Sequence, residues 1–240
     1  MHPFTYIKAK SLADAAALLQ AHPDAKLMSG GMTLLPTLKQ GLAQPSHLID
    51  IAGIAELSGI EVKDGKLTIG AATKHVEVSR SAVVKKAIPA LAYLAGHIGD
   101  PQVRNRGTIG GSLANNDPAA DYPSAALSLG ATIVTNQREI PADHYFQGMF
   151  ATALDASAMI VKIVFPVPAK AAYEKFPHPA SGYAMAGAFV SQHGKTVRVA
   201  ITGAGPGVFR WTEAEAALGK KLAAASVESL NVDASNLNED

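Results

Sequence analysis

Glycines, hydroxyl side chains and small residues are concentrated in one stretch of the chain, residues 106–123. Gly110 and Gly111 lack a Cβ atom, so the backbone can adopt positive φ there and approach a ligand closely. We expect their N–H groups to point at an anion, with the hydroxyl groups of Thr108 and Ser112 on either side. An Ala-rich helical segment follows, and its N-terminus favours negative charge. These features predict a diphosphate cradle, although a Gly-Gly pair taken alone is more often a plain tight turn.

A second glycine pair makes the cradle the stronger interpretation. Residues 29–39 read Ser-Gly-Gly-Met-Thr-Leu-Leu-Pro-Thr-Leu-Lys, which places Gly30 and Gly31 between a short apolar strand and a short helical run. Two such loops, far apart in sequence, can fold against one extended ligand. We therefore expect them to hold its diphosphate from both sides.

Both stretches resemble loops of one protein family. Residues 29–39 resemble the AGG-x-SLLP-x-(M/L)K loop, and residues 108–123 closely resemble the TIGGSLA-x-x-DPAADYP loop, of the FAD-binding medium subunits of molybdenum-containing hydroxylases. These subunits include the medium chain of aerobic carbon monoxide dehydrogenase and the flavin part of xanthine dehydrogenase. The similarity covers almost the whole chain, and the second motif is far more specific than a lone GxGxxG.

The resemblance implies a set of FAD contacts. Asp121 aligns with an aspartate that contacts FAD, where a carboxylate can accept from a ribityl or ribose hydroxyl. Lys175 matches a lysine near the flavin ring that can stabilise negative charge on reduced flavin. The alternative is that Lys175 is an exposed surface lysine with no effect on the flavin. Tyr183 matches an aromatic position near the ring, with core packing as its alternative, and Ile160 matches an apolar contact in a buried strand. The implied contacts are Ser29, Gly30, Gly31, Met32, Thr33, Leu34, Thr108, Ile109, Gly110, Gly111, Ser112, Asp121, Ile160, Lys175 and Tyr183.

By the same resemblance, the chain is the flavin subunit of a molybdenum hydroxylase or dehydrogenase. It would bind FAD noncovalently, take electrons from a [2Fe-2S] small subunit and pass them to an external acceptor. The molybdenum cofactor would reside on a large subunit, in a dimer of heterotrimers. Two alternatives stay open, a stand-alone noncovalent flavin oxidoreductase and a cofactor-free binding or scaffold module that retains the fold.

Composition narrows the classes of function. The 240 residues include no cysteine, which excludes disulfides, thiolate catalysis and iron–sulfur clusters ligated by cysteines of this chain. A net charge of +1 gives no reason to expect nucleic acid or an acidic membrane as partner. Without a signal-like N-terminus or a long apolar run, we expect a cytoplasmic protein with no membrane insertion. The eight histidines show no close pairing, so we expect no metal site.

Two further motifs have simpler interpretations. Residues 203–207, Gly-Ala-Gly-Pro-Gly, follow a predicted strand, but a dinucleotide fingerprint needs glycine at Val208 and a helix thereafter, so a plain loop is favoured. Asp117 and Asp121 could form an acid–base pair. For Asp117, which precedes a proline, turn or cap chemistry is the favoured interpretation.

The helices and strands around these loops are predicted from hydrophobic periodicity and from the glycines and prolines that interrupt it. Ser11 is expected to cap the helix that follows it, and Thr73 is expected to cap the helix that ends at Val78. Thr212-x-x-Glu215 is expected to form a capping box at the start of the last helix. Asp64-Gly65 predicts a tight hairpin turn. The predicted strands are 4–8, 26–28, 47–51, 60–63, 66–69, 131–135, 139–141, 159–165, 183–192 and 195–202, and the predicted helices are 12–21, 74–78, 89–95, 122–129 and 212–218.

The resulting fold class is α+β. Together with the resemblance, it implies a two-lobed vanillyl-alcohol-oxidase (PCMH)-type FAD-binding domain over residues 1–168, with lobes at about 1–52 and 53–168. A small C-terminal α+β domain with an antiparallel sheet follows at 169–240, after the proline-rich segment that ends at Pro168. In the resembling subunits the chain continues for several tens of residues, so this second domain is either naturally short or truncated.

Overall fold

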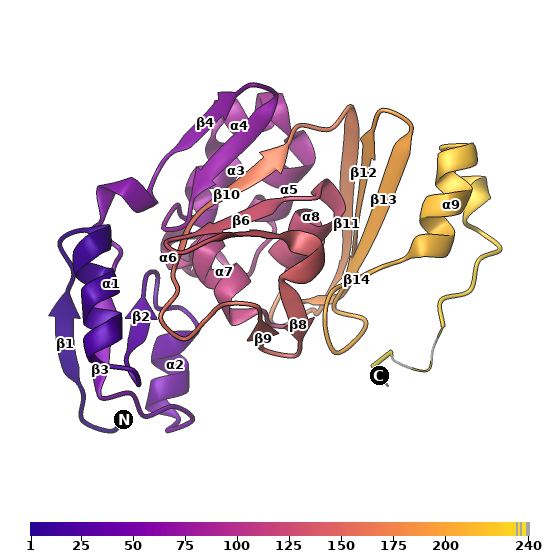
Figure 1. Cartoon of the computed structure of the whole chain (residues 1–240). Helices are drawn as coiled ribbons and strands as arrows, with labels where there is room; N and C mark the ends of the chain where they lie inside the picture. Colours follow the sequence, from indigo (N-terminus) through magenta and orange to yellow (C-terminus); the bar gives the residue numbers. More distant parts are fainter. Residues whose placement is uncertain (234, 236, 239–240) are drawn as a thin grey trace.

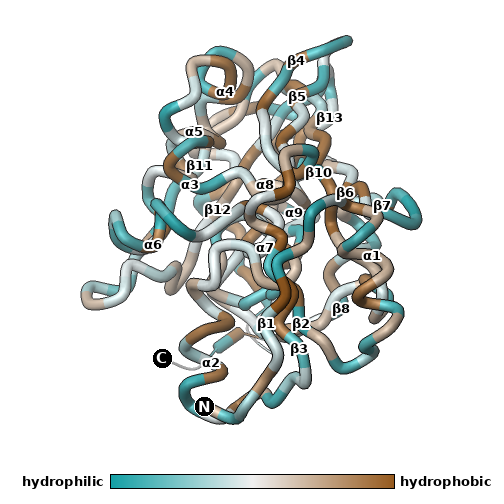
Figure 2. The backbone as a smooth tube through the Cα atoms, turned by 90° about the vertical axis from the view of Figure 1, so that its left-hand side faces the viewer, coloured by the Kyte–Doolittle hydropathy of each residue, from teal (hydrophilic) through white to brown (hydrophobic). Residues whose placement is uncertain are grey.

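The computed structural model describes residues 1–233, 235, 237 and 238, which form an α+β fold (Figure 1). A small N-terminal lobe lies at one side, a five-stranded sheet with its helices lies in the middle, and a C-terminal sheet lies at the other side. Hydrophilic residues mark the hairpins of β4 (Ile60–Lys63) and β7 (Glu139–Pro141), whereas hydrophobic residues run through β10 (Ile160–Pro166) (Figure 2). No helix in the described part of the chain is long and apolar enough to cross a bilayer.

The N-terminal lobe is a parallel three-stranded sheet in the order β1-β3-β2. Ser11 caps α1 by accepting a hydrogen bond from the Asp14 N–H at 3.1 Å, as predicted. Buried Ala15 and Leu19 of this helix pack against the sheet. The elements are β1 (Thr5–Lys8), α1 (Leu12–Ala21), β2 (Lys26–Met28), α2 (Leu34–Lys39) and β3 (His47–Asp50).

The middle region is built on an antiparallel sheet in the order β4-β5-β10-β6-β7. Asp64 and Gly65 both have positive φ, at 50° and 71°, as a two-residue hairpin turn requires. The strands are β4 (Ile60–Lys63), β5 (Lys66–Gly70), β6 (Thr132–Thr135), β7 (Glu139–Pro141) and β10 (Ile160–Pro166), with a small ribbon of β8 (Phe146–Gly148) and β9 (Ala151–Thr152) beside them.

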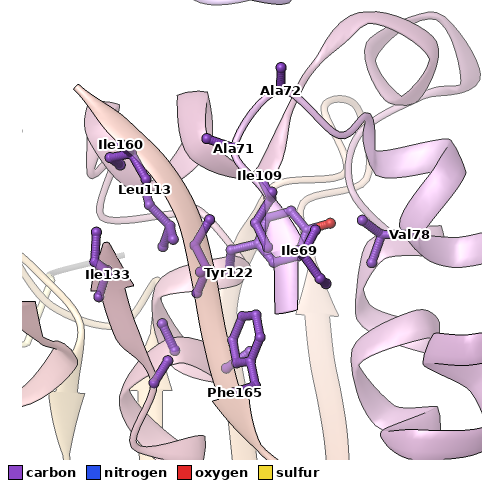
Figure 3. Packing of buried hydrophobic residues seen from close by; sticks show 14 of the residues in the cluster. Ile69, Ala71, Ala72, Val78, Ile109, Leu113, Tyr122, Ile133, Ile160 and Phe165 are labelled. Atoms are coloured by element: carbon purple, nitrogen blue, oxygen red, sulfur yellow. The ribbon is translucent and has the colours of Figure 1, made fainter. Parts of the chain in front are cut away.

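Six short helices accompany this sheet. Apolar side chains of all of them except α6 meet those of β5, β6 and β10 in one core, where Ile69, Ile109, Tyr122 and Phe165 are all almost inaccessible to solvent (Figure 3). The helices are α3 (His75–Arg80), α4 (Ala82–Ala87), α5 (Pro89–Gly96), α6 (Pro101–Arg106), α7 (Ile109–Asn115) and α8 (Tyr122–Leu129), and the 3-10 turns are η1 (Ala55–Leu57) and η2 (Ala142–His144).

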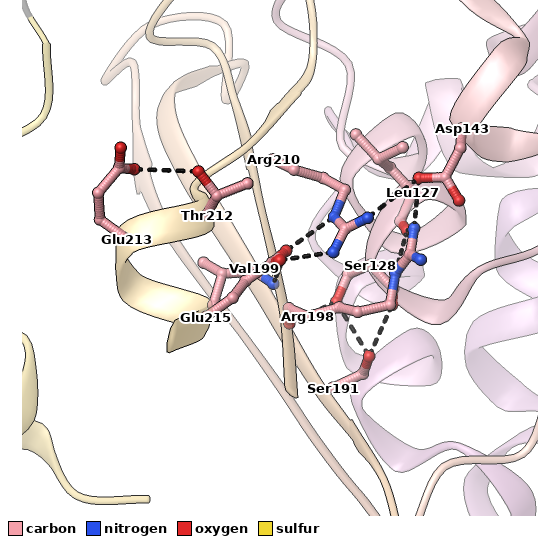
Figure 4. Close-up of polar contacts among 10 residues, drawn as sticks. All are labelled: Leu127, Ser128, Asp143, Ser191, Arg198, Val199, Arg210, Thr212, Glu213 and Glu215. Atoms are coloured by element: carbon pink, nitrogen blue, oxygen red, sulfur yellow. Dashed lines mark hydrogen bonds and ion pairs between the residues drawn. The ribbon is translucent and has the colours of Figure 1, made fainter. Parts of the chain in front are cut away.

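The C-terminal sheet is antiparallel, in the order β11-β12-β13-β14. A polar network joins it to α8: Ser191 donates to the Ser128 carbonyl at 2.7 Å, and Arg198 donates to the Leu127 carbonyl at 2.7 Å (Figure 4). The elements are β11 (Lys170–Pro177), β12 (Ala184–His193), β13 (Thr196–Thr202), β14 (Phe209–Arg210), α9 (Thr212–Lys220) and η3 (Ala224–Ser226).

Two predicted helix caps are wrong. The Thr73 hydroxyl lies 3.3 Å from both the N–H and the carbonyl oxygen of Gly59, and helix α3 begins two residues later. At α9, the Glu215 carboxylate does not close a capping box with Thr212. It instead accepts hydrogen bonds from Arg210 and from the Val199 N–H, because a strand and an arginine lie within its reach.

Candidate functional site

A cleft of about 600 Å³ lies between the N-terminal lobe, helices α6 and α7, and the turn that joins β11 to β12. Both glycine stretches contribute to its wall, so the fold brings together two segments that are far apart in sequence. The predicted site residues that line it are Ser29, Gly30, Gly31, Met32, Thr33, Leu34, Thr108, Gly111, Ser112, Asp121 and Tyr183.

The two stretches touch through backbone atoms. A Cβ atom at Gly30 would lie 2.0 Å from the carbonyl oxygen of Arg106, which no side chain can do. Gly107 is similarly enclosed, because its Cβ would lie 2.6 Å from Nε2 of His75. Glycine is therefore needed at position 30 for the two stretches to close against each other, and at position 107 to leave room for the His75 ring.

The first loop (residues 29–33) presents unused hydrogen-bond donors to the cleft. Gly31 has φ of 73°, which turns the chain before α2 begins. Among the described residues, the N–H groups of Gly31, Met32 and Thr33 donate to no protein acceptor. The Ser29 hydroxyl oxygen is buried and also lacks a partner. Buried polar atoms are normally satisfied, so the Ser29 hydroxyl, beside these free N–H groups in the cleft wall, suits a ligand that forms hydrogen bonds.

The second stretch differs from its predicted conformation. Gly110 and Gly111 lie inside helix α7 rather than at positive φ. Their N–H groups are used internally: Gly110 donates to the Ala71 carbonyl at 2.9 Å, and Gly111 donates to the Thr108 hydroxyl at 3.2 Å. The prediction that these N–H groups face an anion is therefore wrong. Ile109 and Leu113, spaced four residues apart and both fully buried, stabilise the helix instead.

Three predicted contacts lie behind the cleft wall. Ile109 is fully buried in the core, and Ile160 is 6% exposed on β10 (Figure 3). Gly110 packs against Ala71, where a Cβ would lie 2.6 Å from the alanine Cβ. The structure thus assigns these residues to the support of the cleft, and a direct FAD contact by them stays a prediction.

Asp121 belongs to a buried polar cluster with Tyr173 and Lys175. The Tyr173 hydroxyl donates to Oδ1 of Asp121 at 2.5 Å, and Nζ of Lys175 lies 2.9 Å from the same oxygen. The side chain of Lys175 is only 6% exposed, so it is not a surface lysine. Burial raises the pKa of the Asp121 carboxyl, while the Lys175 ammonium and the Tyr173 hydroxyl oppose that rise.

His75 is a cleft residue that sequence reasoning missed. Its side chain is 4% exposed, lines the cleft and leaves Nδ1 without a hydrogen-bond partner. Burial, with the positive charge of Arg104 adding to it, lowers the pKa of His75 to about 4, so the ring is neutral at pH 7. No group of metal-ligating side chains occurs in the described part of the chain. A lone histidine at the start of a short helix carries no sequence signal for such a position.

The two weaker motifs behave as their simpler interpretations predicted. Oδ1 of Asp117 accepts a hydrogen bond from the Ala119 N–H at 2.9 Å, which is turn chemistry. Residues 203–207 form a loop between β13 and β14, and the next helix begins only at Thr212. The Gly203 N–H donates to the Pro118 carbonyl at 2.8 Å, so this loop supports the Asp117 turn.

Comparison with known proteins assigns the family. Residues 2–168 match the family described as the FAD binding domain in molybdopterin dehydrogenase. The chain belongs to this family. It is 40% identical to the carbon monoxide dehydrogenase medium chain of Hydrogenophaga pseudoflava over 220 residues, which is 86% of this chain and 77% of that one. It is 32% identical to the glyceraldehyde dehydrogenase medium chain of Sulfolobus acidocaldarius, over 92% of this chain and 84% of that one.

A solved structure agrees with this assignment. Carbon monoxide dehydrogenase from Hydrogenophaga pseudoflava, in a form that lacks the Mo-pyranopterin moiety of the molybdenum cofactor, superimposes with a TM-score of 0.87 at 41% identity. The match covers 93% of this chain and 83% of that chain. The resemblance seen in the two loop motifs is thereby confirmed, as is the assignment of the chain as an FAD-binding oxidoreductase subunit.

The cleft fits the cofactor of this family. Unused N–H donors and the Ser29 hydroxyl suit the oxygen atoms of a diphosphate. Both short contacts to Asp121 fall on Oδ1, which leaves Oδ2 for a ligand hydroxyl group. The charged residues that line the cleft include the cation Lys26 but also the anions Asp100, Asp117 and Asp155. Neutral backbone and hydroxyl donors, rather than a cluster of cationic side chains, are therefore the groups that would hold a bound diphosphate.

Proposed function

We propose that this chain is the FAD-binding electron-transfer subunit of a molybdenum-containing dehydrogenase complex. The donor-rich first loop facing the cleft is the observation that carries the proposal. The FAD-loaded chain would receive electrons from a [2Fe-2S] small subunit and deliver them to an external acceptor. FAD supplies the chemistry, because a flavin accepts and releases electrons singly or in pairs.

The residues of the cleft have separate tasks in this proposal. Ser29 and the N–H groups of residues 31–33 hold the diphosphate, and the hydroxyl groups of Thr108 and Ser112 complete the opposite wall. Oδ2 of Asp121 accepts a hydrogen bond from a cofactor hydroxyl. Tyr183, which is 50% exposed at the rim, contacts the flavin ring.

The partners follow from the relatives and from the composition. Relatives of this chain are medium chains of enzymes named for carbon monoxide and glyceraldehyde, two very different substrates. Substrate choice is therefore assigned to another subunit, which carries the molybdenum cofactor. Because the sequence has no cysteine, cluster ligands come from a third subunit. The assembly is a dimer of such trimers.

The proposal extends to domain organisation. Residues 1–168 form the PCMH-type FAD-binding domain, with lobes at about 1–52 and 53–168, and residues 169–240 form the C-terminal domain. The parallel sheet of the first lobe and the antiparallel sheet of the second support this division. So does the position of the cleft, whose walls come from both lobes.

Anaerobic flavin reduction tests the proposal. The FAD-loaded chain is mixed with candidate organic substrates, alone and after reconstitution with the two partner subunits, and the loss of flavin absorbance is followed. We expect rapid bleaching only in the complex. Rapid bleaching of the isolated chain by an organic substrate would favour a stand-alone flavin oxidoreductase, and failure to take up FAD would favour a cofactor-free module.

A further inference from the structure

Tyr173 lies at the centre of a buried polar cluster beside the cleft. It extends from β11 toward Asp121, the residue that precedes α8, and is 5% exposed. Its hydroxyl and the Lys175 ammonium both contact Oδ1 of Asp121, at 2.5 and 2.9 Å. One carboxylate oxygen is thus held from two directions.

We propose that Tyr173 is a positioning residue for FAD, which holds Oδ1 of Asp121 so that Oδ2 is presented to a hydroxyl of the cofactor. Asp121 lines the cleft, whereas Tyr173 acts only through it. A carboxylate pinned at one oxygen keeps one orientation, so less rotamer entropy is lost when a ligand hydroxyl binds the other oxygen. This inference rests on the proposed binding of FAD in the cleft.

Gly187 makes room for the Tyr173 hydroxyl. It lies on β12 directly opposite Lys175, and a Cβ atom there would lie 2.7 Å from the hydroxyl oxygen of Tyr173. Any larger residue would push the hydroxyl away from Asp121. Glycine at this position therefore leaves room for the hydroxyl first, and also for Cγ2 of Thr202 and Cε2 of the Tyr173 ring, which the added Cβ would approach to 3.1 and 3.3 Å.

Lys175 links the same cluster to the rim of the cleft. Its ammonium donates to the carbonyl oxygens of His97 and Gly182 at 2.7 and 2.9 Å, in addition to pairing with Asp121. An ammonium has three donors, and these contacts use all three. Lys175 therefore acts on the cofactor through Asp121 and through the two rim segments, residues 97–100 and 181–183, rather than by a direct hydrogen bond.

A matched pair of tyrosine variants tests the proposal. Tyr173→Phe removes the hydroxyl that holds Asp121, and Tyr145→Phe removes a similarly buried hydroxyl that donates to the Leu113 carbonyl and does not contact Asp121. Apoprotein with native circular dichroism is titrated with FAD at pH 7. We expect Tyr173→Phe to raise the dissociation constant for FAD about tenfold, and Tyr145→Phe to leave it unchanged.

The pH dependence distinguishes positioning from a structural role. The titratable groups that face Asp121 are Lys175, Tyr173, Tyr122 and Tyr183. The Tyr173 hydrogen bond lowers the pKa of Asp121, so removing it lets the carboxylate take up a proton at a higher pH. We expect the loss of FAD affinity on acidification to begin at a higher pH in Tyr173→Phe than in the wild type. Superimposable pH profiles would overturn the proposal.

A second variant approaches the same bond from β12. Gly187→Ala should weaken FAD binding in the wild-type background by displacing the Tyr173 hydroxyl. In the Tyr173→Phe background, where that hydroxyl is gone, it should add little. Additive effects of the two substitutions would contradict the proposal. Failure of the wild-type chain itself to bind FAD would instead refute the proposed function.

Discussion

At the scale of single residues, the cleft combines unsatisfied donors with a carboxylate held in place. The Ser29 hydroxyl and the N–H groups of residues 31–33 have no partner among the described residues, while Asp121 is bound by two buried side chains. The sequence motifs located both sets of residues. They could not show that Tyr173 and His75 belong to the site, because each reaches it from a distant part of the chain.

Ser29→Ala should separate cofactor affinity from stability. The hydroxyl has no partner in the protein, so its removal should leave the free energy of unfolding of the apoprotein unchanged within about 0.5 kcal/mol. A hydrogen bond to a charged group contributes about 1.5–3 kcal/mol, so the dissociation constant for FAD should rise by roughly ten- to a hundredfold. Flavin fluorescence titration measures this. As a control, Ser191→Ala should lower stability without changing FAD affinity, since Ser191 bonds to Ser128 away from the cleft.

His75 should give the folded chain a specific sensitivity to acid. Its pKa is about 4 when folded, against an ordinary value of 6.5, so below pH 6.5 the unfolded chain binds a proton that the folded chain does not. Stability is therefore lost as the pH falls, by roughly 3 kcal/mol between pH 6.5 and 4. Denaturant unfolding at several pH values should show a steeper decline for the wild type than for His75→Gln. Parallel curves would show that His75 is protonated in the folded protein.

At the scale of elements, sequence patterns succeeded where the local signal and the tertiary environment agree. The β4–β5 hairpin forms at Asp64-Gly65, and α8 spans the residues predicted for it. The sequence predicts a loop where helix α7 forms, because the two glycines are a stronger local signal than the buried pair Ile109 and Leu113. The short helices α4 and α6 are not predicted from the sequence, and α6 has no buried residue that could produce an apolar periodicity.

The contact between α8 and the C-terminal sheet depends on a few polar residues (Figure 4). Arg198 donates to the Leu127 carbonyl and pairs with Asp143 at 2.6 Å. Burial tends to raise the pKa of Asp143, but Arg198 and Arg210 outweigh it and hold that pKa below its ordinary value. The two arginines together therefore keep the Asp143 carboxylate charged within the network.

Arg198→Met should therefore destabilise the fold. The substitution keeps much of the side-chain length but leaves the Leu127 carbonyl and Asp143 without this donor, which should cost about 2–3 kcal/mol. Urea unfolding monitored by circular dichroism provides the value. Lys195→Met, at an exposed position of the β12–β13 turn, is the matched control and should change stability by less than about 0.5 kcal/mol. Equal effects of both substitutions would show that the network contributes nothing beyond a surface charge.

At the scale of the whole molecule, the cleft is where the N-terminal lobe meets the rest of the chain. The lobe contributes the first loop, and α6, α7 and the β11–β12 turn contribute the other walls. A ligand that spans this cleft therefore adds a link between parts of the protein that already share one hydrophobic core, to which the lobe contributes Ala15, Leu19 and Ile49. FAD binding should stabilise the molecule as a unit.

FAD and riboflavin should thus differ sharply in their effect. FAD at a hundred times its dissociation constant should stabilise the chain by about 2.7 kcal/mol, seen as a higher melting temperature. Riboflavin has the same ring but no diphosphate, and at equal concentration it should stabilise the chain far less. Hydrogen exchange should locate the difference: FAD should protect the amides of residues 31–33, which have no partner, but hardly change those of residues 109–112, which are already bonded. Equal stabilisation by both flavins, or protection confined to residues 109–112, would show that the first loop does not bind the diphosphate.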